Sequence, residues 1–99
     1  MTVAALVPDL MDRSRLGSLV DTFVRTADAL ADVEADVVII DLSRDGAIDA
    51  AAALVARGVR VVAFGSHVDT ATLDDARATG AEVMPRSTFF ADPKRALDA

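Results

Sequence analysis

The sequence contains no cysteine, no tryptophan and no tyrosine, and four phenylalanines are its only aromatic residues. Without cysteine, the chain can form neither a disulfide nor a thiolate metal site. With so few aromatic residues, the core has to be built from valine, alanine, leucine and isoleucine. A hydrophobic fraction of 53% over 99 residues is nevertheless too high for a disordered chain. The length predicts a single domain, residues 1–99, with one modest core.

Basic residues are few and scattered among acids. The chain has 16 acidic and 10 basic residues, which gives a formal net charge of −6. A nucleic acid is therefore not expected as a partner, because its phosphates need a basic surface. No apolar run approaches the roughly 20 residues that cross a bilayer, and the N-terminus lacks the basic flank and cleavage site of a signal peptide. We therefore expect a cytoplasmic protein that binds no membrane.

Short apolar runs alternate with segments of helical spacing. The runs that predict strands cover residues 3–7, 37–42, 59–64 and 82–84. Helical spacing separates the last three runs, and a glycine follows each of these helical segments as a stop signal. A final helix is expected to begin at Asp92, because Pro93 is tolerated in a first turn. The alternation predicts an α/β fold of three layers, in which helices cover both faces of a doubly wound parallel sheet.

Residues 9–35 permit two interpretations. Their apolar residues fit one long amphipathic helix, which would leave a four-stranded sheet. Such a helix of about 20 residues would be about 30 Å long and would overshoot a strand of about 20 Å. Gly17 would also weaken it near the middle. We therefore favour a short helix that ends near Gly17, a strand at residues 21–25 and a second short helix capped by Thr26, which gives five strands.

Polar residues follow the apolar runs at corresponding points. In VVIIDLSRDG, residues 37–46, four branched apolar residues end at Asp41. Such a run is typical of a strand buried on both faces, and open parallel sheets bind ligands beyond the carboxyl ends of their strands. Asp9, Ser66 and Arg86 follow other apolar runs. We therefore expect these four side chains to converge at one edge of the sheet.

These stretches together resemble the receiver domain of bacterial response regulators, a flavodoxin-like module that accepts phosphate on an aspartate. AALVPDL resembles the first strand with its acid pair, VVIIDLSRDG the strand of the phosphorylated aspartate, VVAFGS the strand that ends in threonine or serine, and GAEVMPRSTF the strand that ends in lysine and proline. Residues 64–89 are also similar to a group of small, largely uncharacterised bacterial receiver-like proteins. The resemblance implies a flavodoxin-like fold in which Asp41 is the candidate phosphoacceptor and Ser66 takes the threonine or serine position.

The departures from the receiver pattern fall on the groups that handle phosphate. Pro8 and Asp9 stand where receivers carry two adjacent acids, and Arg86 and Ser87 stand where they carry lysine and proline. Asp9 and Asp41 alone could form at most a weak Mg²⁺ site, so we expect no cofactor. The resemblance with these departures implies a degenerate receiver, a non-enzymatic module that acts in signal transduction through a protein interface.

Other interpretations stay open for the same residues. Asp41 can cap the turn after its strand, Asp9 can cap the first helix, and Arg86 can form an ion pair with either of them in place of a metal. An active phosphoacceptor, with Asp41 as nucleophile and Asp9 as metal ligand, is one alternative function. A flavin-binding module is another, although the loop after Val7 lacks the hydroxyl and glycine residues that would hold a phosphate.

Phe89 and Phe90 adjoin the last predicted strand, near the face where receivers usually meet their partners. Two adjacent phenylalanines at a strand-to-helix junction in so aromatic-poor a chain cannot easily both be buried, so we predict that they mark a protein interface with one of them as its anchor. The alternative is that both pack under the final helix. The sequence identifies neither the protein partner nor the oligomeric state, for which a homodimer is one alternative.

Overall fold

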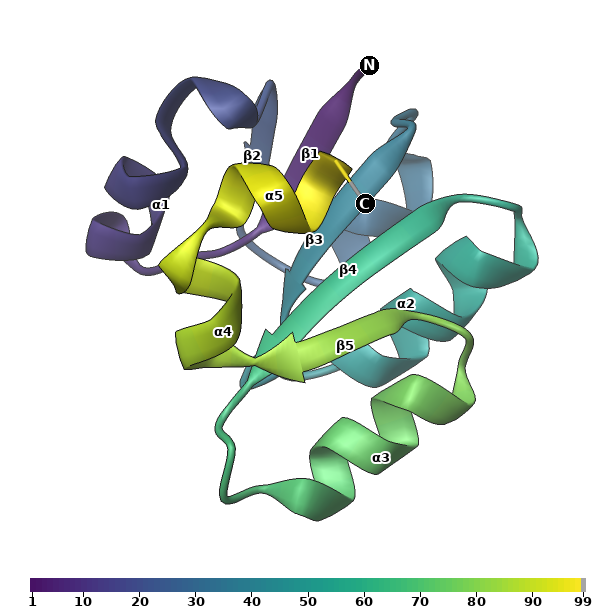
Figure 1. Cartoon of the computed structure of the whole chain (residues 1–99). Coiled ribbons are helices and arrows are strands. Elements are labelled where there is room, and N and C mark those ends of the chain that lie inside the picture. The colour runs from purple at the N-terminus through teal and green to yellow at the C-terminus, as the bar shows by residue number, and fades with distance from the viewer. Residues whose placement is uncertain (99) are drawn as a thin grey trace.

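One parallel sheet organises residues 1–98, the part of the chain that the computed structural model describes (Figure 1). Its strand order is β2-β1-β3-β4-β5, and the prediction of five strands is confirmed. The strands are β1 (Val3–Leu6), β2 (Thr22–Val24), β3 (Val37–Asp41), β4 (Arg60–Gly65) and β5 (Glu82–Pro85). The α-helices are α1 (Leu10–Leu16), α2 (Ala47–Ala56), α3 (Thr70–Ala78), α4 (Arg86–Ala91) and α5 (Pro93–Asp98), and two 3₁₀ helices are η1 (Gly17–Leu19) and η2 (Asp28–Asp32).

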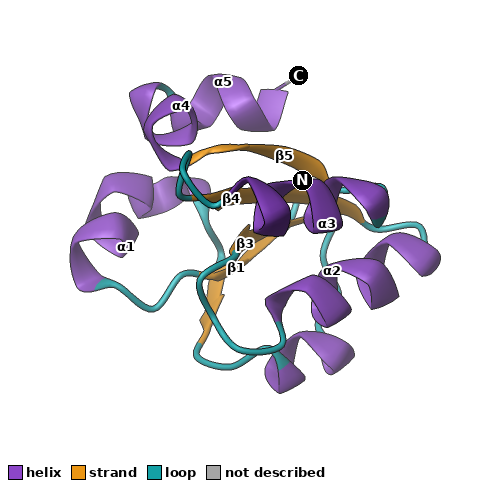
Figure 2. Cartoon of the chain, turned by 90° about the horizontal axis from the view of Figure 1, so that it is seen from below, coloured by secondary structure: helices purple, strands orange, loops and turns teal. Residues whose placement is uncertain are grey.

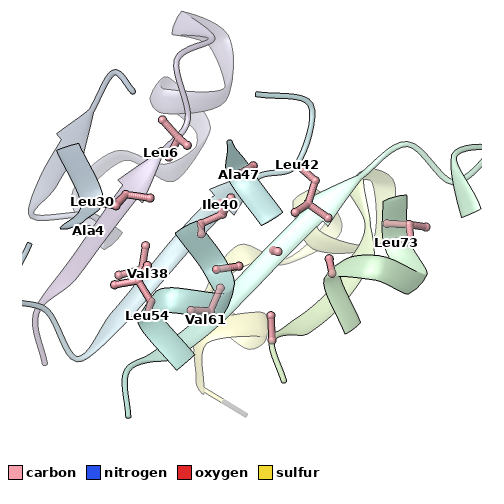
Figure 3. Close-up of a cluster of buried hydrophobic side chains, with 14 residues drawn as sticks. Ala4, Leu6, Leu30, Val38, Ile40, Leu42, Ala47, Leu54, Val61 and Leu73 are labelled. Carbon is pink, nitrogen blue, oxygen red and sulfur yellow. The ribbon is translucent and has the colours of Figure 1, made fainter. Parts of the chain in front are cut away.

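Helices cover both faces of this sheet, as the three-layer prediction requires. Figure 2 shows the strands between one layer that contains α1, α4 and α5 and another that contains α2 and α3. Successive residues of β3 alternate between the two layers: Val38 and Ile40 belong to the cluster under α2 and α3 (Figure 3), and Val37 and Ile39 to the cluster under α1 and α4. All of β3 is buried, which explains its unbroken apolar run. Within residues 1–98, no helix has the length and apolar character needed to cross a membrane.

The ambiguous segment folds as the favoured interpretation predicts, with one difference. Helix α1 stops before Gly17, which has a φ of 50°, and β2 pairs in parallel with β1. The second helix is also in place, and the hydroxyl of Thr26 accepts a hydrogen bond from the amide of Ala29. It is, however, the 3₁₀ helix η2, because the short connection from β2 has to pass over β1 to reach β3 and leaves too few residues for several α-helical turns.

The C-terminal segment contains one helix more than the sequence predicts. The carboxylate of Asp92 caps the final helix α5 through the amide of Arg95, at 3.1 Å. Helix α4 precedes it, so Phe89 and Phe90 lie within a helix and not at a strand-to-helix junction. Six residues that include threonine and two phenylalanines have little intrinsic helical preference, so tertiary packing has to stabilise this helix.

Arg60, the first residue of β4, ties α5 to the amino edge of the sheet. Its guanidinium donates to the carboxylate of Glu82 at 2.5 and 2.9 Å and to the carbonyl oxygens of Leu97 and Ala96 at 2.5 and 3.1 Å. The hydrogen bond from Arg60 lowers the pKa of Glu82 below its ordinary value. A cation at the last carbonyls of a helix also interacts favourably with the helix dipole.

We expect Arg60→Met to lower the free energy of unfolding by about 1–2 kcal/mol at neutral pH, because half-exposed ion pairs contribute little and hydrogen bonds from a charged donor contribute more. Since the pKa of Glu82 is lowered in the folded state, its share is present above about pH 4 and is lost as the pH falls further. The difference in the free energy of unfolding between Arg60→Met and wild type should therefore become smaller in acid but should not disappear. Denaturant unfolding followed by circular dichroism checks this, with the exposed Arg95→Met as control. Equal stability of both variants would contradict the role of Arg60.

Candidate functional site

Four sequence-predicted residues meet where the strands of the sheet end. Asp9, Asp41 and Arg86 line one cavity of about 380 Å³. Ser66 lines a neighbouring cavity of about 310 Å³, which Asp41 and Arg86 also line. Asp41 ends β3, Ser66 follows β4 and Arg86 follows β5. The structure thus brings all four residues to the carboxyl edge of the sheet. In Figure 1, the arrowheads of β4 and β5 mark this edge beside α4.

Asp41 is buried, with 8% of its surface exposed, and one of its carboxylate oxygens accepts hydrogen bonds from Ser43. Its Oδ1 accepts hydrogen bonds from the backbone amide of Ser43 at 2.9 Å and from the hydroxyl of Ser43 at 2.7 Å. These bonds stabilise the turn after β3, because a side-chain carboxylate bonded two residues ahead reproduces the hydrogen bond of a backbone turn. Asp41 therefore has a structural role in the turn, and it also borders both cavities.

Asp9 caps helix α1. Its Oδ1 accepts from the amides of Met11 and Asp12 at 2.9 and 3.0 Å. Such a cap satisfies amides that have no partner within the helix, and a negative charge is favourable at that end of the helix dipole. The capping interpretation therefore describes Asp9 in this structure.

Arg86 is paired with Asp12, a residue that was not among the predicted site residues. Nη1 of Arg86 donates to Oδ2 of Asp12 at 2.7 Å, and Nη2 donates to Oδ1. The side chain of Asp12 is 3% exposed, whereas that of Arg86 is 45% exposed. The prediction that Arg86 pairs with Asp41 or Asp9 was therefore wrong. Both of those carboxylates are engaged by nearby backbone amides, and Asp12 projects from the first turn of α1 into the same cavity.

The position of Asp12 follows from the helical repeat. Asp12 and Leu16 are the buried residues of α1 and are four residues apart. Residues at this spacing lie on the same face of a helix. An acid on the buried face of a helix that begins beside a strand end was therefore a usable signal in the sequence, because a buried carboxylate needs a partner.

The guanidinium of Arg86 has a fixed position and a fixed charge. Its hydrogen bonds to Asp12 raise the pKa of Arg86 further, and the negative charges of Asp41 and Asp9 act in the same direction. The guanidinium carbon lies 4.8 Å from the ring centroid of Phe90 and 5.7 Å from that of Phe64. Cations over aromatic rings are attracted by the negative ring face. Arg86 thus supplies a permanent positive charge that is oriented by α1 on one side and by aromatic rings on the other.

The residues at this edge do not fit a Mg²⁺ ion. Mg²⁺ requires near-octahedral oxygen ligands, and residues 1–98 contain no group of three or more histidine, aspartate or glutamate side chains placed to hold a metal. Asp9 caps a helix, Asp12 is bound at both oxygens by Arg86, and one oxygen of Asp41 accepts from Ser43. A guanidinium also occupies the neighbourhood of these acids and already balances part of their charge.

Phe89 cannot act as the interface anchor that the sequence suggested, because its side chain is completely buried. Its ring is stacked on Phe64 with centroids 5.0 Å apart and planes 14° apart. Phe90 is half-buried, and its ring meets both of these rings edge-on at 5.0 Å. The guanidinium of Arg15 lies 5.4 Å from the same ring. The interface prediction therefore applies to Phe90 alone.

Comparison with solved structures identifies chains with the same fold. The receiver domain of RcsB from Salmonella enterica serovar Typhimurium superposes with a TM-score of 0.78 at 18% identity, over 100% of this chain and 86% of that one. A LuxR-family two-component response regulator from Aurantimonas gives 0.77 at 20% identity, over 98% and 81%. The receiver domain of a modulated diguanylate cyclase from Desulfovibrio desulfuricans gives 0.77 at 18% identity, over 98% and 90%.

Sequence comparison gives no closer relationship: no protein-family model matches the chain, and no curated protein matches it. The similarity to solved structures therefore concerns the arrangement of the chain. The strand order and the helices on both faces of the sheet agree with that arrangement. The chain has the flavodoxin-like fold of response-regulator receiver domains.

Proposed function

We propose that this protein is a degenerate receiver, a signalling module of the bacterial cytoplasm that binds a protein partner and does not take up phosphate. The bidentate pair between Arg86 and Asp12 is the observation that carries this proposal. It places a permanent cation at the strand ends and holds it against a carboxylate of the same chain. The cation at the edge that would receive a phosphoryl group is therefore already paired with a carboxylate of the same chain.

Phosphoryl transfer to a carboxylate would need groups that this edge does not offer. The charge on the transferred group has to be neutralised by a metal ion and by a cation that can follow it. After β1, Pro8 stands where the receiver pattern has a carboxylate. Asp12 binds the guanidinium of Arg86 through two hydrogen bonds. A planar guanidinium held this way cannot move to an incoming phosphate without leaving Asp12 unpaired in the interior.

The proposal predicts that a small phosphodonor such as acetyl phosphate leaves the protein unmodified in the presence of Mg²⁺. Intact-mass spectrometry checks this, with Asp41→Asn as the matched variant and an active receiver domain as the positive control. We also expect negligible binding of Mg²⁺ at millimolar concentration. Calorimetry is the suitable method for this binding, because the chain has no tryptophan or tyrosine to report it. A phosphate adduct that disappears in Asp41→Asn would replace the proposal with the active phosphoacceptor.

The partner surface that we propose surrounds Phe90 on α4. Phe90 is half-buried and in contact with Arg15 of α1 and Arg86 of its own helix. Aromatic and arginine side chains are the residue types that most often dominate binding energy in protein interfaces. A homodimer through this surface is one form of the proposal, and analytical ultracentrifugation of wild type and Phe90→Asp distinguishes it from a different partner.

A further inference from the structure

A groove of about 740 Å³ lies between η2 and α2, next to the turn that follows β3. One wall comes from residues 25–31 and the other from residues 43–54. The groove lies beside the short 3₁₀ helix η2, which has five residues against ten in α2. Its volume falls within the range of roughly 300–1,000 Å³ that small-molecule sites occupy.

The floor of this groove is apolar. Leu30 and Leu54 are each 1% exposed and belong to the core cluster beneath α2 (Figure 3), and the side chains of Ala27 and Ala50 are half-buried beside them. Gly46 brings the turn close to η2, and a Cβ added there would lie 3.2 Å from the Cβ of Ala27. Because both leucines are buried, the accessible apolar part of the floor consists of Ala27 and Ala50, one from each wall.

The rim carries charges of both signs, and within residues 1–98 these side chains form no ion pair with one another. Its charged residues are Arg25, Arg44, Asp28, Asp45 and Asp49, all of them exposed. The ion pairs within residues 1–98 join other side chains: Arg60 with Glu82, Arg77 with Asp74, and Arg86 with Asp12. Each wall of the groove therefore presents one guanidinium and at least one carboxylate to a ligand that carries the opposite charges.

We propose that this groove binds a small zwitterion with an apolar side chain, of the class of the free aliphatic amino acids. The arginines would take its carboxylate, which guanidinium groups bind through paired hydrogen bonds. The aspartates would take its ammonium group, and the half-buried Ala27 and Ala50 would contact its side chain. A simple anion or a simple cation fits less well, because each would face like charges on the same rim.

The experiment titrates the 99-residue chain, labelled with ¹⁵N, with each of the 20 free L-amino acids at millimolar concentration. We expect L-valine, L-leucine or L-isoleucine to shift the amide signals of residues 25–31 and 43–50. N-acetyl-L-leucine lacks the ammonium group and L-leucinamide lacks the carboxylate, and each should bind about tenfold more weakly than L-leucine because one charged contact is lost. The absence of shifts in both walls for all 20 amino acids would overturn the proposal.

Substitutions of groove residues identify which side chains contact the ligand. Arg25→Gln should weaken L-leucine binding about tenfold and leave L-leucinamide binding unchanged, and Asp49→Asn should affect L-leucine but not N-acetyl-L-leucine. Ala50→Phe fills the floor and should abolish binding, whereas Ala52→Phe, on an exposed part of the same helix and outside the groove, should not. If Ala50→Phe does not fold, the variants at the exposed residues, Arg25→Gln and Asp49→Asn, still test the proposal. L-leucine affinity that is unaffected by both of them would overturn the proposal, whatever the outcome of the phosphodonor experiment.

Discussion

Replacing Arg86 with alanine should lower the free energy of unfolding by about 2 kcal/mol, because it leaves the carboxylate of Asp12 buried without its cation. Removal of one partner from a fully buried ion pair typically destabilises by about 3–5 kcal/mol. Since the side chain of Arg86 is 45% exposed, water can reach part of the vacated space and reduce this loss. The ring of Phe90 also loses the cation above it, which adds a smaller term. Denaturant unfolding followed by circular dichroism measures the change.

A second substitution identifies the partner of Arg86. In the Arg86→Ala background, Asp12→Asn should recover part of the lost stability, because a neutral amide is easier to bury than an unpaired carboxylate. Asp41→Asn should recover little, because the carboxylate of Asp41 accepts two hydrogen bonds from Ser43 and not from Arg86. The opposite result, recovery through Asp41 alone, would restore the ion pair that the sequence suggested.

Arg77→Ala provides the matched control for Arg86. Arg77 also forms an ion pair, with Asp74 one helical turn away, but both side chains are largely exposed, at 49% and 73%. Such surface pairs usually contribute less than about 1 kcal/mol. A similar loss in both variants would indicate that burial of Asp12 is not the reason for the effect at Arg86.

Four of the five strands could be predicted from the sequence because each corresponds to a short apolar run. The run at residues 37–42 is apolar on both faces, and β3 is buried on both faces in the structure. The strand at residues 21–25 depended on length, since a single helix would overshoot the sheet, and β2 lies there as Thr22–Val24. The length of a helix relative to that of a strand therefore predicted β2 correctly, where periodicity alone favoured a helix.

The partners of the charged residues could not be predicted in the same way. Strand ends place Asp41, Ser66 and Arg86 at one edge because parallel strands share their direction, and this needs no side-chain detail. Which carboxylate meets Arg86 depends on how α1 is rotated about its axis. Oδ1 of Asp9 caps the helix, and Asp12 on the first turn of α1 pairs with Arg86.

Helix α4 could not be predicted from the sequence because its stability depends on tertiary packing, mainly on that of Phe89. The ring of Phe89 fills the space between α4 and β4, stacked on Phe64 and fully buried. Phe89→Ala should lower the free energy of unfolding by about 3–5 kcal/mol, through lost burial and the cavity that remains. For a domain with a stability of about 5–15 kcal/mol, this is a large share. Unfolding monitored by circular dichroism again gives the value.

Phe90→Ala separates a core role from an interface role in the same helix. The ring of Phe90 is half-buried and touches Phe64 and Phe89 edge-on, so its removal should lower stability by about 1–2 kcal/mol, well below the loss at Phe89. Part of this loss comes from Arg15 and Arg86, whose guanidinium groups lie over the ring. Equal losses at the two positions would mean that Phe90 is a core residue like Phe89, and the surface around it would then no longer qualify as the partner interface.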